Sequence, residues 1–310
     1  MTEPRTRVAA FDCGTNSIRL LICDLQGSVK TDHLREMKIV RLGQDVDRTG
    51  RLADEAIGRT LSATRDYAEL IPLLGVERIV FCATSAVRDA SNGEAFCHAI
   101  EGILGVRPIV LDGPSEARAT FLGATRELSP ERSLVVDIGG GSTEVVVGMG
   151  GEIESGVSLD IGSVRLTERF LASDPPTADE IAECTAYVDS LLAPVAAFAP
   201  VSRFVGVAGT ITTVVARALK LEAYDSRAIH GAELTHETLR SACRELIGMT
   251  VADRRALPFM HQGRADVIGG GALILDRILE LLPLDTDTMT ASVQDILDGI
   301  AWMAAEPQLG

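Results

Sequence analysis

Two short stretches of the chain combine an aspartate with a turn of small residues. Residues 11–22 read FDCGTNSIRLLI and residues 136–147 read VDIGGGSTEVVV. In each stretch an apolar run that ends in aspartate meets small residues and then a second apolar run, which predicts a strand, a glycine-rich turn and a strand. Glycines allow several backbone N–H groups to converge on an anion, and the aspartate can hold a hard cation beside it. The chemistry indicated is the binding of phosphate together with a metal ion.

The two stretches belong to a longer repeat. Each of Asp12, Gly14 and Ser17 has a counterpart 125 residues later, at Asp137, Gly139 and Ser142. The segments RIVFCATSAV (78–87) and RFVGVAGTIT (203–212) have the same spacing. Repeated strand-to-helix corners at one spacing predict a duplicated fold. We expect two similar domains that face each other across a cleft, each with one phosphate loop; a purely structural duplication is the alternative.

The composition is that of a globular chain with an aliphatic core. Its 310 residues, 46% hydrophobic and 4% aromatic, leave room for about two domains. No apolar run reaches the length of a membrane span and the N-terminus lacks a signal-peptide pattern, so we expect a cytoplasmic protein without a membrane partner. The net charge of −15 argues against a nucleic-acid surface. A polyanionic ligand must therefore be held by local groups.

The six cysteines are scattered and lie mostly in apolar runs, which indicates reduced core residues. Cys13 differs from the others because it lies inside the first loop. The five histidines show no metal-binding spacing. Neither residue type predicts a zinc site.

The loops must be positioned by the elements around them. In a first domain, residues 1–125, we expect strands at 7–13, 18–25 and 34–42, a polar loop at 43–52, a helix at 54–74 that Gly75 ends, a strand at 78–83, a helix at 93–104, a strand at 107–111 and a helix that begins at GPSEAR. In a second domain, residues 126–310, we expect a strand at 133–138, a hairpin at 142–160, helices at 163–171 and 178–198, a strand at 203–207, helices from Thr210 and at 236–248 and 264–282, a strand at 287–291 and a helix at 294–305.

Seven segments, together and in this order, resemble the exopolyphosphatase and guanosine pentaphosphate phosphatase family. They are DCGTNSIRLL, ATSAVRDASN, GPSEARATFLG, DIGGGSTE, GSVRLTERF, GVAGTIT and RADVIGGGALIL. The resemblance covers essentially the whole chain. It implies an α/β fold of duplicated ribonuclease-H-like domains, as in the actin-like ATPase superfamily, with an interdomain cleft. It also implies removal of the terminal phosphate of polyphosphate, or of the 5′ γ-phosphate of pppGpp, by water attack assisted by Mg²⁺ or Mn²⁺.

Glu116, in GPSEAR, matches the catalytic glutamate of the family. The resemblance implies that it orients or deprotonates the attacking water. The alternative is that Glu116 only stabilises the first turn of a helix, after Pro114, through the helix dipole. The chain departs from the commoner family pattern by Ser115, where an acidic residue often precedes the glutamate.

Three carboxylates are candidates for the metal site. Asp137 and Glu144 match family residues implicated in Mg²⁺ binding, and Asp12 is the duplicate of Asp137. Mg²⁺ usually takes one or two carboxylates and substrate phosphates, so three candidates suffice. The alternative for Glu144 is an exposed strand residue.

Candidate phosphate ligands lie in both halves. They are Gly14, Thr15, Asn16 and Ser17 in the first loop, Gly140, Gly141 and Ser142 in the second, Gly209 and Thr210 at the start of a helix, and the side chains of Arg88 and Arg264. Arg19 and Arg165 are left open between this role and that of surface or interdomain ion-pair residues.

Many family members continue into helical domains with an HD motif, whereas this chain ends at Gly310 and resembles the short, two-domain members. A short polyphosphate or a nucleotide is therefore the expected substrate, and a homodimer is a candidate assembly. Two other functions stay open. IGGGALIL at 268–275 resembles the adenosine-binding loop of kinases in the superfamily, which would indicate a phosphotransferase. A catalytically silent protein that binds polyphosphate or the alarmone is the other.

Overall fold

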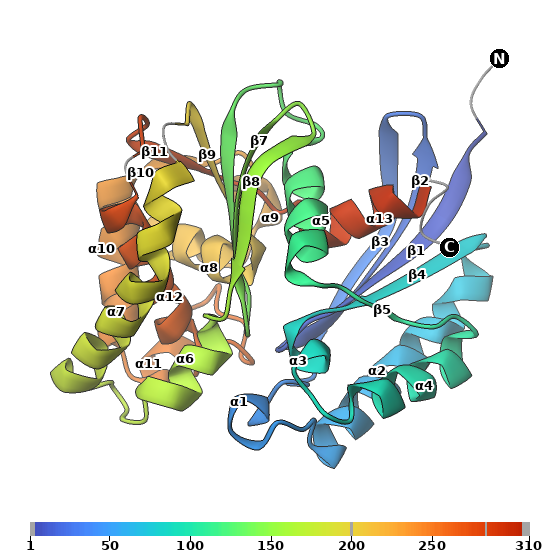
Figure 1. Cartoon of the computed structure of the whole chain (residues 1–310), viewed down its shortest axis with the longest axis horizontal. Coiled ribbons are helices and arrows are strands. Elements are labelled where there is room, and N and C mark those ends of the chain that lie inside the picture. Colours follow the sequence, from blue (N-terminus) through green and yellow to red (C-terminus); the bar gives the residue numbers. More distant parts are fainter. Residues whose placement is uncertain (1–3, 199–200, 283, 306–310) are drawn as a thin grey trace. The chain divides into compact units, whose positions relative to one another are not determined.

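The chain folds into two compact units. The computed structural model describes residues 4–198, 201–282 and 284–305 (Figure 1). Unit 1 is formed by residues 1–123 together with 296–310, and unit 2 by residues 124–295. This division differs from the expected second domain, residues 126–310, because the last helix, α13 (Ile296–Ala305), contacts β1, β2 and β4 of unit 1. The chain therefore passes from one unit to the other twice.

Unit 1 is built on a five-stranded sheet. Its strands are β1 (Thr6–Cys13), β2 (Ser17–Gln26), β3 (Val29–Ile39), β4 (Arg78–Ala83) and β5 (Ile109–Val110), in the order β3-β2-β1-β4-β5. Its helices are α1 (Val46–Thr49), α2 (Asp54–Leu73), α3 (Ser85–Arg88), α4 (Gly93–Leu104), α5 (Gly113–Thr125) and α13. β1 runs antiparallel to β2 and parallel to β4. The first loop therefore lies at the edge of the sheet where β1 and β4 both end.

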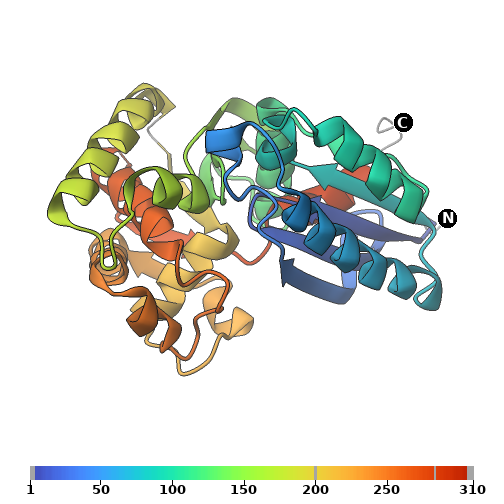
Figure 2. The same cartoon turned by 90° about the horizontal axis from the view of Figure 1, so that it is seen from below.

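The central strand β1 of unit 1 is buried on both faces. Along β1, Phe11 and Cys13 join a core cluster that includes residues of α2 and α4, whereas Val8 and Ala10 join a cluster that includes residues of α13. Alternate residues of a strand point to opposite faces, so both faces of the sheet need helices. α2 and α4 cover one face (Figures 1 and 2) and α13 covers the other.

Unit 2 is built on a six-stranded sheet. Its strands are β6 (Ser133–Ile138), β7 (Thr143–Met149), β8 (Glu152–Leu159), β9 (Arg203–Val207), β10 (Glu233–Thr235) and β11 (Thr288–Ala291), in the order β10-β11-β9-β6-β7-β8. Its helices are α6 (Ser163–Phe170), α7 (Ala178–Leu192), η1 (Ala193–Phe198), α8 (Ala208–Ala218), α9 (Ser226–Ile229), α10 (His236–Gly248), α11 (Val251–Arg255) and α12 (Ile268–Leu281). α7 begins with a capping box of Thr177 and Glu180.

The strands next to the two loops repeat the same pairing, residue for residue: β1 pairs with β2 and β4 in the register in which β6 pairs with β7 and β9. Val8 pairs with Arg78 in unit 1, and Ser133, 125 residues later, pairs with Arg203 in unit 2. The order β3-β2-β1-β4-β5 in unit 1 corresponds to β8-β7-β6-β9-β11 in unit 2, which has β10 as an additional edge strand. The expected α/β fold with a duplicated unit is confirmed, and the two loops occupy equivalent places in it.

Several expected boundaries need correction. The loop at 43–52 contains the short helix α1, and the strand expected at 34–42 spans Val29–Ile39. The helix expected at 178–198 ends at Leu192 and continues as a 3₁₀ turn, the helix expected at 264–282 begins at Ile268, and the strand expected at 107–111 has two residues. The short elements α9, β10 and α11 were not predicted, because three to five residues carry little periodicity.

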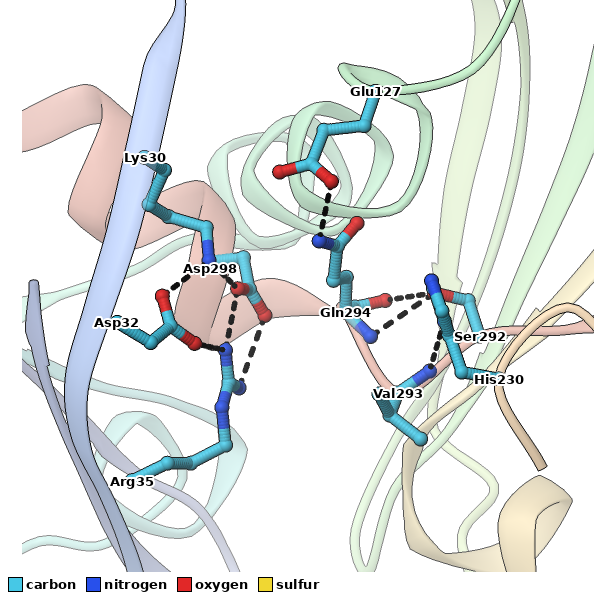
Figure 3. A network of polar contacts seen from close by, with 9 residues as sticks. All are labelled: Lys30, Asp32, Arg35, Glu127, His230, Ser292, Val293, Gln294 and Asp298. Atoms are coloured by element: carbon cyan, nitrogen blue, oxygen red, sulfur yellow. Dashed lines mark hydrogen bonds and ion pairs between the residues drawn. The ribbon is translucent and has the colours of Figure 1, made fainter. Parts of the chain in front are cut away.

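A buried carboxylate holds α13 to unit 1. Asp298, 0% exposed, accepts hydrogen bonds from Arg35 at 2.6 and 3.1 Å and lies 3.0 Å from Lys30 Nζ (Figure 3). Both cations lie on β3, and Asp32 pairs with each of them. In unit 2, Gln294 donates to Glu127 at 2.8 Å, which joins the beginning and the end of that unit (Figure 3). A buried charge is tolerated only when it is paired, so the Asp298 network specifies where the end of the chain docks.

Asp298→Asn is expected to lower the free energy of unfolding by about 3 kcal/mol, the lower end for removal of one partner from a buried ion pair, since Lys30 keeps Asp32. Urea denaturation followed by circular dichroism measures this change. Asp66→Asn is the control, because Asp66 pairs with Lys38 on the exposed surface of the same unit and its loss costs less than about 1 kcal/mol. Equal losses in the two variants would contradict the anchoring role of Asp298.

Candidate functional site

The first loop is a tight turn between β1 and β2. The Gly14 amide donates to the Ser17 carbonyl at 2.9 Å. The carbonyls of Thr15 and Asn16, between these two residues, accept hydrogen bonds from the segment after β3. The Thr15 carbonyl accepts from the amide of Gly43 at 2.8 Å, and the Asn16 carbonyl accepts from the amides of residues 40 and 41 at 3.0 and 2.9 Å. The carbonyls of the loop are therefore occupied on one side. Since N–H and C=O of a trans peptide point in opposite directions, the N–H groups of Asn16 and Ser17 point to the other side.

The short helix α3 connects the first loop to Glu116. At its beginning the Ser85 hydroxyl is 3.0 Å from the Thr15 hydroxyl, and both side chains are buried. At its end Arg88 donates from Nη1 to the Glu116 carboxylate and to the Leu111 carbonyl, each at 2.8 Å. The structure therefore brings Arg88 and Glu116 into contact, a pairing that sequence reasoning, which placed Arg88 on phosphate, did not predict.

Glu116 is buried although it lies in the first turn of α5. Only 4% of the residue is exposed. A glutamate that served only the helix dipole would gain nothing from burial, because burial disfavours its charged form. Its carboxylate is instead fixed by the ion pair with Arg88. Such a group has the fixed position that a catalytic base requires.

Ser115 has a local structural role at the start of α5. Its amide donates to the Asp112 carboxylate at 2.9 Å, and its hydroxyl also bonds to that carboxylate. These hydrogen bonds lower the pKa of Asp112. Asp112 thus acts as an N-terminal cap of the helix, and an acidic side chain at 115 would meet the negative charge of Asp112.

Asp12 is held by an arginine of the neighbouring strand. Arg19 lies directly across from Asp12 in the β1–β2 ladder and donates from Nε and Nη2 to Oδ2 at 2.8 and 2.6 Å. Arg19 therefore forms an ion pair within unit 1. This bidentate contact occupies one oxygen of the carboxylate that was expected to assist the metal.

The second loop repeats the turn of the first. The Gly139 amide donates to the Ser142 carbonyl at 3.0 Å, which matches the bond from Gly14 to Ser17. The carbonyls of Gly139, Gly140 and Gly141 accept hydrogen bonds from the beginning of α6 and from the side chain of Arg165. Arg165 therefore contacts the second loop directly, a role that sequence reasoning did not assign to it.

Asp137 and Glu144 form a pair of buried carboxylates beside the second loop. They lie directly across from each other in the β6–β7 ladder and are 5% and 2% exposed. The Ser158 hydroxyl donates to Glu144 at 2.7 Å. Because Glu144 is buried, the alternative of an exposed strand residue is wrong. Its position in the sheet is equivalent to that of Arg19 in unit 1. Like charges directly opposite in a sheet repel each other, and a bound cation relieves that repulsion.

The corner between β9 and α8 carries the remaining candidates. Gly209 lies under the guanidinium of Arg264: a Cβ at Gly209 would come within 2.5 Å of Cζ. Ala208, which precedes it, has a φ of +70°, unusual for a residue with a side chain. Thr210 is buried. The structure thus brings Arg264 to the start of α8, at the edge of the sheet where β6 and β9 both end.

The glycines of IGGGALIL lie at the start of α12 and serve close packing. A Cβ at Gly270 would come within 2.8 Å of the Ser163 carbonyl, and one at Gly271 within 2.6 Å of the Thr210 hydroxyl. Residues 268–275 are all buried. Close helix packing accounts for these glycines without an adenosine ligand.

Other candidate groups do not add to the site. Cys13 is fully buried, and burial raises the pKa of its thiol well above the usual value, so the thiol stays protonated. Among the described residues, no group of three or more carboxylate, histidine or cysteine side chains is arranged to hold a metal ion. The pair Asp137 and Glu144 fits the one or two carboxylates that Mg²⁺ usually takes. In the same part of the chain no helix has the length and apolar character needed to cross a membrane.

Sequence comparison places the chain among phosphatases. Residues 25–300 match the model of the Ppx/GppA phosphatase family. The chain is 46% identical over 312 aligned positions to exopolyphosphatase 2 of Mycobacterium tuberculosis, with 96% of this chain and 98% of the relative covered.

Solved structures of similar proteins have the same fold. The Ppx/GppA protein of Aquifex aeolicus is 32% identical and superposes with a TM-score of 0.83, over 98% of this chain and all of that one. An exopolyphosphatase from Cytophaga hutchinsonii is 26% identical with a TM-score of 0.89, over 96% and 98% of the two chains. With the paired loops, the buried Glu116 and these relatives taken together, the chain is a phosphatase and belongs to the Ppx/GppA phosphatase family.

Proposed function

We propose that the protein is an exopolyphosphatase that releases the terminal orthophosphate of inorganic polyphosphate. The observation that carries this proposal is the link through α3: Ser85 contacts the first anion loop and Arg88, three residues later, holds the buried carboxylate of Glu116. A base fixed beside a phosphate loop is what hydrolysis of a phosphoanhydride requires. A relative of nearly full coverage is named exopolyphosphatase 2, which agrees with this substrate.

Glu116 acts as the general base. A water molecule attacks the terminal phosphorus while its proton passes to the Glu116 carboxylate, and the bond from that phosphorus to the bridging oxygen breaks. The products are orthophosphate and a polyphosphate shorter by one unit. Backbone N–H groups of the first loop, to which α3 links Glu116, stabilise the charge on the phosphoryl oxygens.

Asp137 and Glu144 are the residues that would hold Mg²⁺ or Mn²⁺. They are adjacent and buried, as ligands of a hard cation should be. Asp12 is the weaker candidate because Arg19 occupies one of its oxygens. The bound cation would neutralise charge on the phosphoryl oxygens.

The same residues would act on the 5′ γ-phosphate of pppGpp, which is therefore the alternative substrate. A phosphotransferase is disfavoured because the glycines of α12 are accounted for by packing. Phosphate release from short polyphosphate, long polyphosphate, pppGpp and ATP, measured in parallel, separates these activities. Binding without phosphate release would instead indicate a regulatory protein.

Glu116→Gln is expected to lower turnover by at least ~10²-fold, the lower end for loss of a general base, while short polyphosphate still binds. Phosphate release and isothermal titration calorimetry measure the two quantities. Glu55→Gln is the matched control, because Glu55 occupies the first turn of α2 but is exposed. Unchanged turnover in Glu116→Gln would contradict the role of general base and would favour the alternative, in which Glu116 only stabilises the first turn of α5.

Arg88→Met tests what the ion pair does. If Arg88 holds Glu116 in place, kcat falls by about 10-fold or more while KM changes little, and Arg88→Lys restores part of it. The control is Arg107→Met, which removes an exposed arginine of unit 1. A higher KM at unchanged kcat would instead place Arg88 on the phosphate alone.

Removal of either carboxylate of unit 2 is expected to weaken metal binding. Asp137→Asn and Glu144→Gln should raise the Mg²⁺ concentration for half-maximal activity by at least ~10-fold, and Asp12→Asn by less. Binding of Mn²⁺ followed by electron paramagnetic resonance gives a readout independent of turnover. Unchanged Mn²⁺ affinity in both unit 2 variants would rule out this site.

A further inference from the structure

The carbonyl groups of Gly139, Gly140 and Gly141 in the second loop are directed toward α6. Three consecutive carbonyls accept hydrogen bonds from residues at the start of that helix. The bonds are Ser163 N to Gly139 O (2.9 Å), Val164 N and Arg165 N to Gly140 O (2.9 and 3.1 Å), and Arg165 Nε to Gly141 O (2.8 Å). The first N–H groups of a helix lack partners within the helix, so these bonds satisfy both the helix and the loop.

The orientation of the carbonyls determines that of the amides. Each peptide is planar and trans, so its N–H points away from its C=O. With the carbonyls of residues 139–141 directed toward α6, the N–H groups of Gly140, Gly141 and Ser142 point away from it. Three successive amides that share one direction form a concave site for an anion.

Gly162 allows α6 to approach the loop. A Cβ at this position would lie 2.4 Å from the carbonyl carbon and oxygen of Gly140 and 2.5 Å from the nitrogen of Gly141. Its φ of −160° and ψ of 166° are open to any residue, so the backbone angles do not require glycine. The close contact requires it, and any side chain at 162 must displace the Gly140–Gly141 peptide.

Arg165 connects the helix to two successive peptides of the loop. Its backbone amide bonds to the Gly140 carbonyl and its guanidinium Nε to the Gly141 carbonyl. In unit 1 the segment at 40–43 holds the carbonyls of the first loop with backbone amides. Each loop is thus oriented by hydrogen bonds to its carbonyls. In the second loop, the Gly141–Ser142 peptide depends on the side chain of Arg165.

We propose that Gly162 and Arg165 are positioning residues that aim the amides of residues 140–142 at a polyphosphate oxyanion. The inference rests on the proposed function, since it assumes that this loop binds the substrate. Neither residue touches the anion through the contacts described: Gly162 sets the distance between helix and loop, and Arg165 sets the rotation of the Gly141–Ser142 peptide.

The test measures binding of inorganic tripolyphosphate with Mg²⁺ by isothermal titration calorimetry, in full-length protein that carries Glu116→Gln to prevent turnover. We expect Gly162→Ala and Arg165→Gln each to weaken binding by at least ~10-fold, the change for loss of one hydrogen bond to a charged group. Arg165→Lys should recover part of the affinity, because its ammonium group can donate to the Gly141 carbonyl. In NMR spectra, the shifts of the amides of residues 140–142 on adding tripolyphosphate should shrink in both weakened variants.

Two controls separate orientation from general damage. Gly248→Ala adds a methyl group that points into open space, and Arg244→Gln removes an exposed positive charge from the same unit. Both should bind tripolyphosphate as the background protein does. If Gly162→Ala does not fold, Arg165→Gln decides the question.

Two outcomes distinguish the failure of this inference from that of the function. If the background protein does not bind tripolyphosphate, the proposed function fails. If it binds and the Gly162 and Arg165 variants bind equally well, the function stands and the positioning role is overturned. Weaker binding with unchanged amide shifts of the loop would also overturn it.

Discussion

The planar peptide group is the constraint on which the two loops depend. A loop can offer its N–H groups to an anion only if its carbonyls point elsewhere and have donors there. In this protein those donors come from the segment that follows each hairpin: residues 40–43 in unit 1 and the start of α6 in unit 2. The glycines give the loop backbones conformational freedom. The segment that follows each hairpin then fixes one conformation, in which the carbonyls point toward that segment.

The duplication preserves geometry but not charge. Pairing in the two sheets is identical over β1, β4, β6 and β9, yet the residue across from the loop aspartate is Arg19 in unit 1 and Glu144 in unit 2. The first aspartate is therefore neutralised by a neighbour, whereas the second shares its side of the sheet with another acid. One change of residue type at equivalent positions gives the two loops different chemical surroundings, which is why we propose the metal site in unit 2.

Two features characterise unit 1. Its catalytic candidate, Glu116, is fixed by Arg88 through a helix of only four residues, α3. One face of its sheet is covered by α13, which follows unit 2 in the sequence. Ion pairs of Asp298 with Lys30 and Arg35 connect that helix to β3. β1 and α13 are therefore parts of one folded unit, so residues far apart in sequence share one core.

The duplicated fold, the family and the long helices could be predicted from the sequence alone. The repeat at 125 residues was sufficient to predict a duplicated fold, because equivalent strands and turns recur at one fixed spacing in the sequence. The family motifs were sufficient to predict membership, and the resemblance implied the α/β class of the fold. Periodicity located the long helices to within a few residues, since apolar side chains recur at the helical period only where one face is buried. Short elements such as α9, β10 and α11 left no such signal.

Only the tertiary structure decided the partners of the charged residues. Arg88 was expected on phosphate and pairs with Glu116; Arg19 and Arg165 looked alike in sequence, yet one binds a carboxylate and the other a loop carbonyl. Gly162 was not singled out, because its backbone angles do not require glycine and only the nearby peptide does. The last helix likewise joined unit 1 rather than its sequence neighbours. Periodicity and spacing report which face of an element is buried, but contacts between distant residues arise only when the elements are packed in three dimensions.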